Sequence, residues 1–245
     1  MPDPVETDAP KAAMIFAAGF GTRMGALTRD RPKPLIPVAG HKLLDRALAL
    51  ARVEVDHIVT NAHYHADQIA AHLTGSGVNL LIETPDILDT GGGLKAAIPT
   101  LANDPVFTLN PDVVWTGPNP LTVLRSQWRR QMQALLLLIP AERAVGRIGG
   151  GDFSMDADGR LSRGGDLIYC PSSVGRRSGM PRDRQSIGAA LVELDAFGRP
   201  RAALSQPCDE LVVHDAADVR AHGVIGRRPA LSHRAHQRPH DFLAE

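Results

Sequence analysis

Short apolar runs alternate with segments of helical periodicity over the first 140 residues of the chain. Runs with the length and continuity of buried strands occupy residues 12–18, 57–60, 79–82, 106–109 and 134–139. Apolar side chains fall on one helical face in residues 42–52, 67–73, 93–98 and 121–130. Parallel strands need crossover connections and are covered on both faces, so this alternation predicts an α/β fold with a doubly wound, mostly parallel sheet over residues 11–140.

The pattern weakens after Pro140 and leaves a less regular C-terminal part. Residues 156–160 form a turn signal that predicts a hairpin between two strands. Residues 226–240 are dense in Arg, His and Pro and have little hydrophobic periodicity. We therefore expect a flexible leader over residues 1–10, one domain over 11–225, and an irregular or disordered tail over 226–245.

Composition and charge exclude several classes of function. The 27 Lys and Arg residues balance 27 Asp and Glu residues, so no net field attracts nucleic acid or an anionic membrane. No apolar run reaches the roughly 18–20 residues of a membrane helix, and the acidic start does not resemble a secretory signal. We expect a cytoplasmic protein, a monomer or small homo-oligomer, that binds neither nucleic acid nor membrane.

The loop after the first predicted strand is a candidate phosphate-binding site. In open α/β sheets, ligands bind beyond the carboxyl ends of the strands. Two glycines in this loop allow a tight turn whose N–H groups face an anion, and an arginine adds a charged fork. The candidate residues are Ala17, Ala18, Gly19, Gly21, Thr22 and Arg23. The loop lacks the Gly-Lys-Ser/Thr of a Walker A motif and the third glycine of a dinucleotide fingerprint.

A lysine between two prolines follows shortly after this loop. Lys33 stands in the stretch R-P-K-P-L-I-P-V-A-G at residues 31–40. Prolines on both sides favour an extended backbone, so we expect Lys33 to be held in a form suited to meeting a phosphate. The alternative for such a lysine is a solvated position in a rigid surface loop.

Together, A-A-G-x-G-T-R-M at residues 17–24 and the proline-flanked lysine resemble the start of the sugar-1-phosphate nucleotidyltransferases. Within that superfamily the chain is most similar to the N-acetylmuramate-1-phosphate uridylyltransferases and the mannose-1-phosphate guanylyltransferase-like proteins, over about residues 11–165. The resemblance implies a Rossmann-like, nucleotide-diphospho-sugar transferase fold, with a nucleotide-binding half over 11–140 and an acceptor-side half over 141–225. It also implies catalytic roles for Arg23 and Lys33 in binding the phosphates.

Two further stretches extend the resemblance. The loop L-D-T-G-G-G at residues 88–93 follows the third strand, and by the family pattern Thr90 and Gly91 contact the nucleotide base. The fourth strand ends in N-P-D, where the family brings a carboxylate to a Mg²⁺ cofactor, so Asp112 is the expected metal ligand. The family usually has glycine before this acid, whereas this chain has Pro111.

The acceptor side offers weaker candidates. Trp115, three residues after the metal ligand, has an indole that could cover the apolar face of a sugar ring. Asp152 lies in a G-G-G-D-F stretch similar to one near the sugar site of the muramate-type enzymes. The family's second metal-binding aspartate, in W-x-D-V-G-T, has no full counterpart here; the nearest fragment is A-D-V-R, which makes Asp218 the candidate.

The predicted activity joins a nucleoside triphosphate, with UTP favoured, to a sugar 1-phosphate such as N-acetylmuramate 1-phosphate, and releases pyrophosphate. The missing C-terminal motif leaves an alternative open, namely a catalytically impaired homologue that binds nucleotide or sugar nucleotide and has a regulatory role. An NAD-dependent oxidoreductase is disfavoured, because no acidic residue ends the second strand at residues 57–61 to bind a ribose.

Overall fold

The computed structural model describes residues 9–130, 132–145, 149–156 and 161–176, together with the backbone of residues 189–193 and 212–215. The predictions for most of the leader, for the tail over 226–245 and for Asp218 therefore lie outside the described residues. In the part of the chain that is described, no helix is long and apolar enough to cross a membrane.

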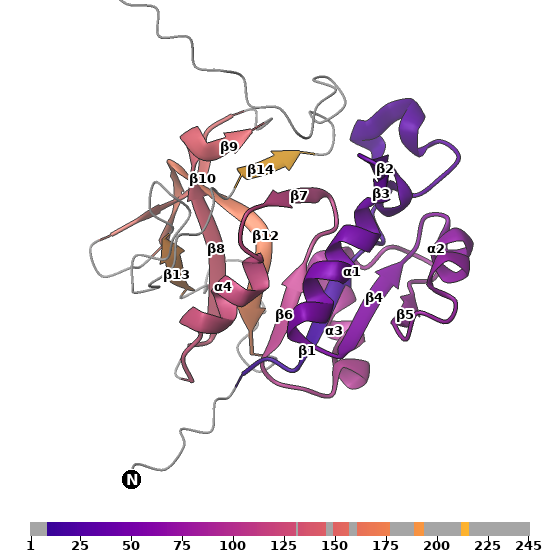
Figure 1. The fold of residues 1–245 in the computed structure, drawn as a ribbon, viewed down its shortest axis with the longest axis horizontal. Coiled ribbons are helices and arrows are strands. Elements are labelled where there is room, and N and C mark those ends of the chain that lie inside the picture. The colour runs from indigo at the N-terminus through magenta and orange to yellow at the C-terminus, as the bar shows by residue number, and fades with distance from the viewer. Residues whose placement is uncertain are drawn as a thin grey trace, which may run out of the picture.

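Four parallel strands form the centre of the main sheet, in the spatial order β6 (Val106–Leu109), β1 (Ala12–Phe16), β4 (His57–Ala62) and β5 (Asn79–Ile82). Each crossover between strands that are consecutive in this half contains a helix: α1 (Leu43–Glu54), α2 (Ala66–Leu73) and α3 (Asp89–Leu101). Figure 1 shows these helices beside the strands that they connect. The predicted doubly wound α/β fold is confirmed.

The two faces of this sheet bury different sets of side chains. Along β1, Ala13 and Ile15 belong to the larger core cluster, which includes apolar residues of α1, α2 and α4 (Pro120–Gln127). Ala12 and Met14 point to the other face and pack with residues of α3. All four side chains are fully buried. A strand covered on both faces reads as a continuous apolar run, which is why the sequence showed no alternation here.

A strand from the later part of the sequence lies between two earlier strands of the main sheet, a position that periodicity did not predict. β12 (Leu167–Gly175) pairs antiparallel with β6 on one side and with β8 (Ala134–Pro140) on the other. Because β12 is antiparallel to both, β6 and β8 run in the same direction, and the sheet stays mostly parallel. The predicted hairpin is present as β10 (Gly151–Met155) and β11 (Leu161–Gly165), and β13 (Ala189–Glu193) pairs parallel with β8.

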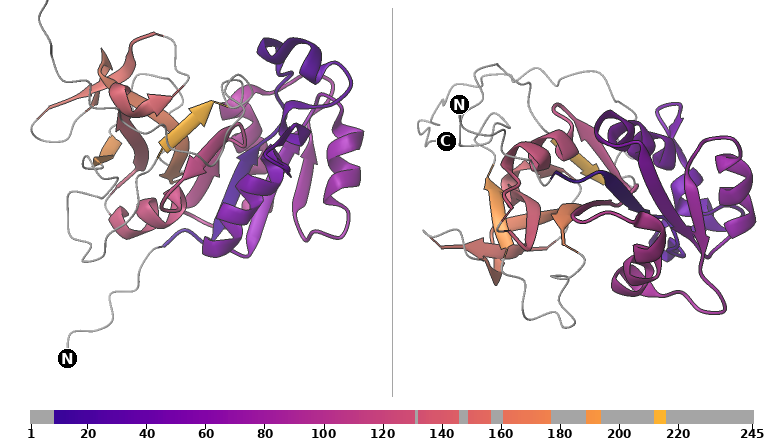
Figure 2. Two further views of the ribbon diagram at one scale, coloured as in Figure 1. Left: turned by 45° about the horizontal axis from the view of Figure 1, so that its top comes forward. Right: turned by 90° about the horizontal axis from the view of Figure 1, so that it is seen from below.

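Smaller elements surround this sheet. A second sheet contains β7 (Val113–Thr116), β14 (Val212–Asp215) and β9 (Ala144–Val145), and β2 (Pro37–Val38) pairs with β3 (His41–Lys42). Short 3-10 helices cover Thr22–Thr28 (η1), Lys33–Leu35 (η2) and Ala141–Arg143 (η3). Figure 2 shows the parallel strands and their helices at one end of the molecule and the antiparallel C-terminal strands at the other.

The helices α3 and α4 differ most from their predicted bounds. α3 begins at Asp89 rather than near residue 93, because the glycines that suggested a loop lie inside its first turns. It also continues past the predicted end to Leu101, which is fully buried. α4 ends at Gln127, three residues before the predicted end: the Trp128 N–H still donates to the Leu124 carbonyl oxygen, but the extended backbone of Trp128 stops the helix there.

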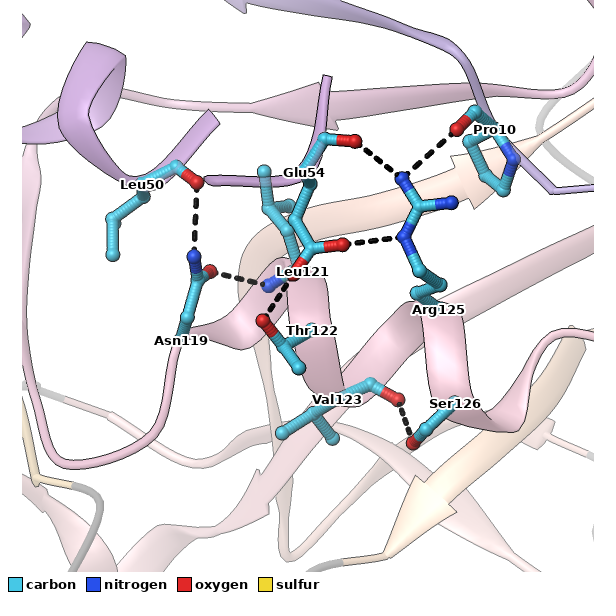
Figure 3. A network of polar contacts seen from close by, with 9 residues as sticks. All are labelled: Pro10, Leu50, Glu54, Asn119, Leu121, Thr122, Val123, Arg125 and Ser126. Atoms are coloured by element: carbon cyan, nitrogen blue, oxygen red, sulfur yellow. Dashed lines mark hydrogen bonds and ion pairs between the residues drawn. The ribbon is translucent and has the colours of Figure 1, made fainter. Parts of the chain in front are cut away.

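A polar network ties α1 to α4 at the end of the sheet where β1 begins (Figure 3). The Arg125 guanidinium contacts the Glu54 carboxylate and donates to the carbonyl oxygens of Glu54 and Pro10. Thr122 also donates to the Glu54 carboxylate, and Asn119 caps α4 by accepting from the Leu121 N–H. The Glu54 side chain is only 8% exposed. A buried carboxylate needs polar partners, and here Thr122 contacts one oxygen and Arg125 the other.

Candidate functional site

The carboxyl ends of the parallel strands open into a pocket of about 270 Å³. Its walls come from the loop after β1, from the last residues of β4, from the segment between β5 and α3, and from the loop after β6. The lining residues are Phe16, Ala17, Ala18, Gly19, Gly21, Thr22, Arg23, Met24, Lys33, Pro34, Asn61, Glu83, Ile87, Asp89, Thr90, Asn110, Pro111 and Asp112. This is the place at which open α/β sheets bind ligands.

Gly21 shapes the first wall of this pocket. Its φ is +66°, and a Cβ at this position would lie 2.9 Å from Thr28 Cγ2 and 3.0 Å from Lys33 Cβ. The position therefore needs glycine for both its conformation and its packing. The Gly21 carbonyl oxygen accepts from the Met24 N–H and from the Thr28 hydroxyl, which closes the turn and starts η1. Arg23, exposed in that turn, lies at the pocket wall.

The backbone conformation at Lys33 differs from the extended form that its flanking prolines predicted. Pro32 is extended, but Lys33 begins the 3-10 turn η2, in which Ile36 N–H donates to the Lys33 carbonyl oxygen. The expectation of an extended backbone at Lys33 was wrong, because this turn buries Pro34 and Leu35 in the core. Burying two apolar side chains outweighs the local preference of a residue that precedes proline.

Lys33 and Asp112, which both line the pocket, form an ion pair. Lys33 Nζ donates to Asp112 Oδ2 at 2.7 Å, and the two side chains are 21% and 34% exposed. Asp112 follows β6, whose end is held because the Asn110 N–H donates to the carbonyl oxygen of Pro171 in β12. Pro111 is buried in the pocket wall, so a proline fits where the family usually has glycine. The pocket thus carries a cation and an anion at one edge.

The glycine-rich segment at the start of α3 has residues that face the pocket and a glycine that packs inside the protein. Thr90 lines the pocket, and its N–H bonds to the Asp89 carboxylate at 2.8 Å. A Cβ at Gly91 would meet nothing within 4 Å, so this exposed glycine leaves open space for a ligand. A Cβ at Gly93 would lie 2.7 Å from both Asn61 Nδ2 and Glu83 Oε1. Gly93 is therefore explained by close packing inside the protein.

Asn61 and Glu83 are pocket residues that the sequence analysis missed. Each is only 2% exposed, and each stands at the carboxyl end of a parallel strand, β4 for Asn61 and β5 for Glu83. A polar side chain at the end of a buried strand was the available signal. In the sequence, Asn61 stands only where an NAD-binding protein would have its ribose-binding acid.

The predicted sugar-side residues lie apart from the residues that line this pocket. Trp115 in β7 packs against the larger core cluster. The Asp152 carboxylate in β10 accepts from the Tyr169 N–H at 3.0 Å, and burial raises the pKa of the Tyr169 phenol above its ordinary value. Neither Trp115 nor Asp152 is among the lining residues, so their contact with a sugar stays a prediction. Of the predicted phosphate, base and metal residues that the structure describes, the pocket gathers all except Gly91.

This geometry can be compared with known proteins. The MobA-like NTP transferase domain matches residues 13–224, which is most of the chain. The protein belongs to the MobA-like NTP transferase domain family. An N-acetylmuramate alpha-1-phosphate uridylyltransferase from Caulobacter vibrioides is 39% identical to it over 164 residues, which cover 62% of this chain and 68% of that relative. The class of enzyme predicted from the sequence, a sugar-1-phosphate nucleotidyltransferase, is confirmed.

Other relatives match a shorter stretch of the chain. An N-acetylmuramate alpha-1-phosphate uridylyltransferase from Neisseria meningitidis is 39% identical over 108 residues, and a mannose-1-phosphate guanylyltransferase from Mycobacterium tuberculosis is 33% identical over 107 residues. Each match covers 42% of this chain, but only 47% and 30% of the two relatives. The chain thus spans less than half of the length of these two proteins.

Solved structures agree with the fold. HddC from Yersinia pseudotuberculosis superimposes with a TM-score of 0.59 at 17% identity, over 75% of this chain and 90% of that one. The same protein complexed with GMP-PN gives a TM-score of 0.60 at 18% identity, over 86% and 97% of the two chains. At this level of identity the likeness shows the shared architecture and nothing about the ligand of this chain.

Proposed function

We propose that this protein transfers a nucleotidyl group from a nucleoside triphosphate to a sugar 1-phosphate and releases pyrophosphate. The observation that carries the proposal is the meeting of Arg23, Lys33 and Asp112 with the glycine loop in one pocket. Asp112 lies 79 positions after Lys33 in the sequence, yet it lines the same pocket. Their convergence at the carboxyl ends of parallel strands is what a triphosphate site requires.

The glycine loop and the two cations would hold the triphosphate. A Cβ at Gly19 would meet nothing within 4 Å, so the backbone there leaves room for phosphate oxygens, and Arg23 supplies a planar fork for their charge. Lys33 adds a compact positive charge, held in place by the η2 turn. Thr90 and the open space at Gly91 lie where the base and ribose would extend.

In the reaction, a phosphate oxygen of the sugar 1-phosphate forms a bond to the α-phosphorus of the triphosphate. The bond from that phosphorus to the oxygen bridging to the β-phosphate breaks, and its electron pair leaves with pyrophosphate. No side-chain nucleophile is needed, so the protein contributes by orienting the two substrates in line and by neutralising charge. Arg23 and Lys33 are the residues that we assign to charge neutralisation.

The donor set at Asp112 fits a hard divalent cation such as Mg²⁺. Mg²⁺ is usually bound through one or two carboxylates together with substrate phosphates and water, which matches one half-exposed aspartate beside a phosphate loop. When bound, Mg²⁺ would neutralise charge on the phosphates. Among the described residues, no group of three His, Cys, Asp or Glu side chains could hold a metal without such help. Asp218 stays our candidate for a second carboxylate.

We favour UTP as the nucleotide and N-acetylmuramate 1-phosphate, or a similar hexose 1-phosphate, as the acceptor. The support is the Caulobacter relative, whose name gives this reaction and of which the match covers 68%. A relative named for mannose-1-phosphate guanylyl transfer makes GTP the next nucleotide to examine. Asp152 and Trp115 remain the residues that we propose for the acceptor side.

A pyrophosphate-release assay tests this function. The full chain is incubated with Mg²⁺ and each of UTP, GTP, CTP, dTTP and ATP, each combined with several hexose 1-phosphates including N-acetylmuramate 1-phosphate. We expect the highest rate with UTP and the muramate substrate, and no release when either substrate is omitted. Absence of turnover with every pair would reject the enzymatic function.

A second candidate is a homologue that binds nucleotide without transferring it. The observation in its favour is that Asp112 is already neutralised by Lys33 at 2.7 Å, and the described residues supply no acidic cluster around this ion pair. A regulatory binder of this kind would show nucleotide affinity in calorimetry while releasing no pyrophosphate. The enzymatic function predicts both signals together.

A further inference from the structure

A continuous chain of hydrogen bonds connects the phosphate loop to the start of α3. The Ala17 N–H donates to Asn61 Oδ1 at 2.7 Å, and Asn61 Nδ2 donates to Glu83 Oε1 at 2.7 Å. The Leu88 N–H donates to Glu83 Oε2 at 2.8 Å. Ala17 begins the phosphate loop, and Leu88 is the residue before α3, so two side chains join the two walls of the pocket.

The direction of every bond in this chain is fixed by its neighbours. A backbone N–H can only donate, so Asn61 must turn its oxygen to Ala17 and its NH₂ group to Glu83. Glu83 meets a donor on each carboxylate oxygen. Both side chains are 2% exposed, so a reversed group would leave a buried donor facing another donor. The pair therefore holds one arrangement only.

The surroundings leave the pair no room to shift. Gly93 of α3 lies so close that a Cβ there would be 2.7 Å from both Asn61 Nδ2 and Glu83 Oε1. The backbone of Glu83 is also held, because its N–H donates to the Ala62 carbonyl oxygen at 2.8 Å and its own carbonyl oxygen bonds to the His63 ring at 2.9 Å. Because a close-packed buried pair of this kind cannot easily deform, a displacement of one pocket wall is passed on to the other.

We propose that Asn61 and Glu83 are positioning residues that set the spacing between the phosphate loop and the Leu88–Gly91 segment, and thereby the affinity for the nucleotide. This inference rests on the proposed function, because it takes one nucleotide to contact both walls. A nucleotide gripped at both ends loses affinity when the spacing changes, even where each wall is intact. The residues proposed for the acceptor side, Asp152 and Trp115, take no part in this chain of hydrogen bonds, so we expect acceptor binding to be independent of it.

Exchanging the two polar groups provides a direct test. In Asn61→Asp, two carboxylate oxygens face each other where a 2.7 Å hydrogen bond was, and in Glu83→Gln one buried donor faces another. The double variant Asn61→Asp with Glu83→Gln restores the chain. The introduced carboxylate accepts from the Ala17 N–H and from the introduced amide, and the amide oxygen accepts from the Leu88 N–H. This variant also keeps the net charge of the original pair.

The experiment measures KM for UTP, KM for the sugar phosphate and kcat in the two single variants and the double variant. We expect each single variant to raise the KM for UTP about tenfold or more, with the other two parameters within about threefold, and the double variant to recover most of the affinity. Gly93→Ala, which pushes the pair apart, should also raise the KM for UTP. Matched controls are Asn79→Asp and Glu142→Gln, which are exposed and line no part of the pocket.

Several outcomes separate this inference from the proposed function. If the wild type turns over and the double variant binds UTP no better than the single ones, the inference is overturned while the function stands. A loss of thermal stability with an unchanged KM for UTP would also overturn it, because that is the signature of a merely structural role. If the wild type shows no turnover, the same comparison is made on UTP affinity by calorimetry, where recovery by the exchange supports the inference and its absence rejects it.

Discussion

Lys33 is the half-buried cation of the pocket, and its partner Asp112 lies 2.7 Å away. A phosphate would compete with the carboxylate for the lysine, and a divalent cation would compete with the lysine for the carboxylate. Both exchanges favour the same product, in which Lys33 faces phosphate and Asp112 faces metal. The ion pair therefore holds both side chains in position for a ligand that carries charges of both signs.

Replacing Lys33 by methionine should remove this charge while keeping the apolar stem. We expect kcat/KM for the nucleotide to fall about 100-fold or more, as when one donor to a developing negative charge is lost. Thermal stability should change little, because Asp112 is 34% exposed and water can replace the lysine. Steady-state kinetics and a thermal melt measure the two effects. Lys95→Met, at an exposed position of α3, is the control, and equal activity in both variants would contradict this role.

At the scale of elements, the pocket depends on how β1 and the helices around it are anchored. The Arg125 network joins α1, α4 and Pro10 at the amino end of β1, opposite to the end where the pocket opens (Figure 3). Pro10, which the sequence assigned to the flexible leader, is buried here. The network fixes two of the helices that cover one face of the sheet and includes none of the pocket residues.

Arg125→Ala should therefore affect stability and leave the chemistry alone. Removing the guanidinium leaves the Glu54 carboxylate, only 8% exposed, without its opposite charge, which we expect to lower the free energy of unfolding by about 3 kcal/mol. Urea unfolding followed by circular dichroism gives this value, and kcat and KM are measured well below the melting temperature. Arg129→Ala, at an exposed position of the segment after α4, is the comparison. A similar small change in both variants would show that the network contributes little.

At the scale of the whole molecule, the sequence predicted individual strands and helices better than the pairing of strands within the sheet. Buried strands such as β1 and β6 were predicted from continuous apolar runs, and the crossover helices from their periodicity. The insertion of β12 between β6 and β8 was not predicted, because β12 pairs with a strand about 65 positions earlier in the chain. The mixed polar and apolar sequence of β12 gave no sign of its two partners.

The candidate site shows the same division. Motif positions indicated the glycine loop, Lys33, Thr90 and Asp112, and all of them line one pocket. Asn61 and Glu83 belong to none of these motifs, and their contact arises only because β4 and β5 lie side by side. The flanking prolines also predicted the wrong backbone conformation at Lys33, because burial of Pro34 and Leu35 decided it.

A crystal structure of the full chain with UTP and Mg²⁺ tests the proposed triphosphate site directly. We expect the triphosphate to lie against the loop at residues 17–23, with Arg23 and Lys33 on its oxygens and the base beside Thr90. The cation should lie on Asp112, which is then released from its ion pair with Lys33. A nucleotide bound at another surface, or a triphosphate that contacts neither cation while the ion pair persists, would contradict the proposed site.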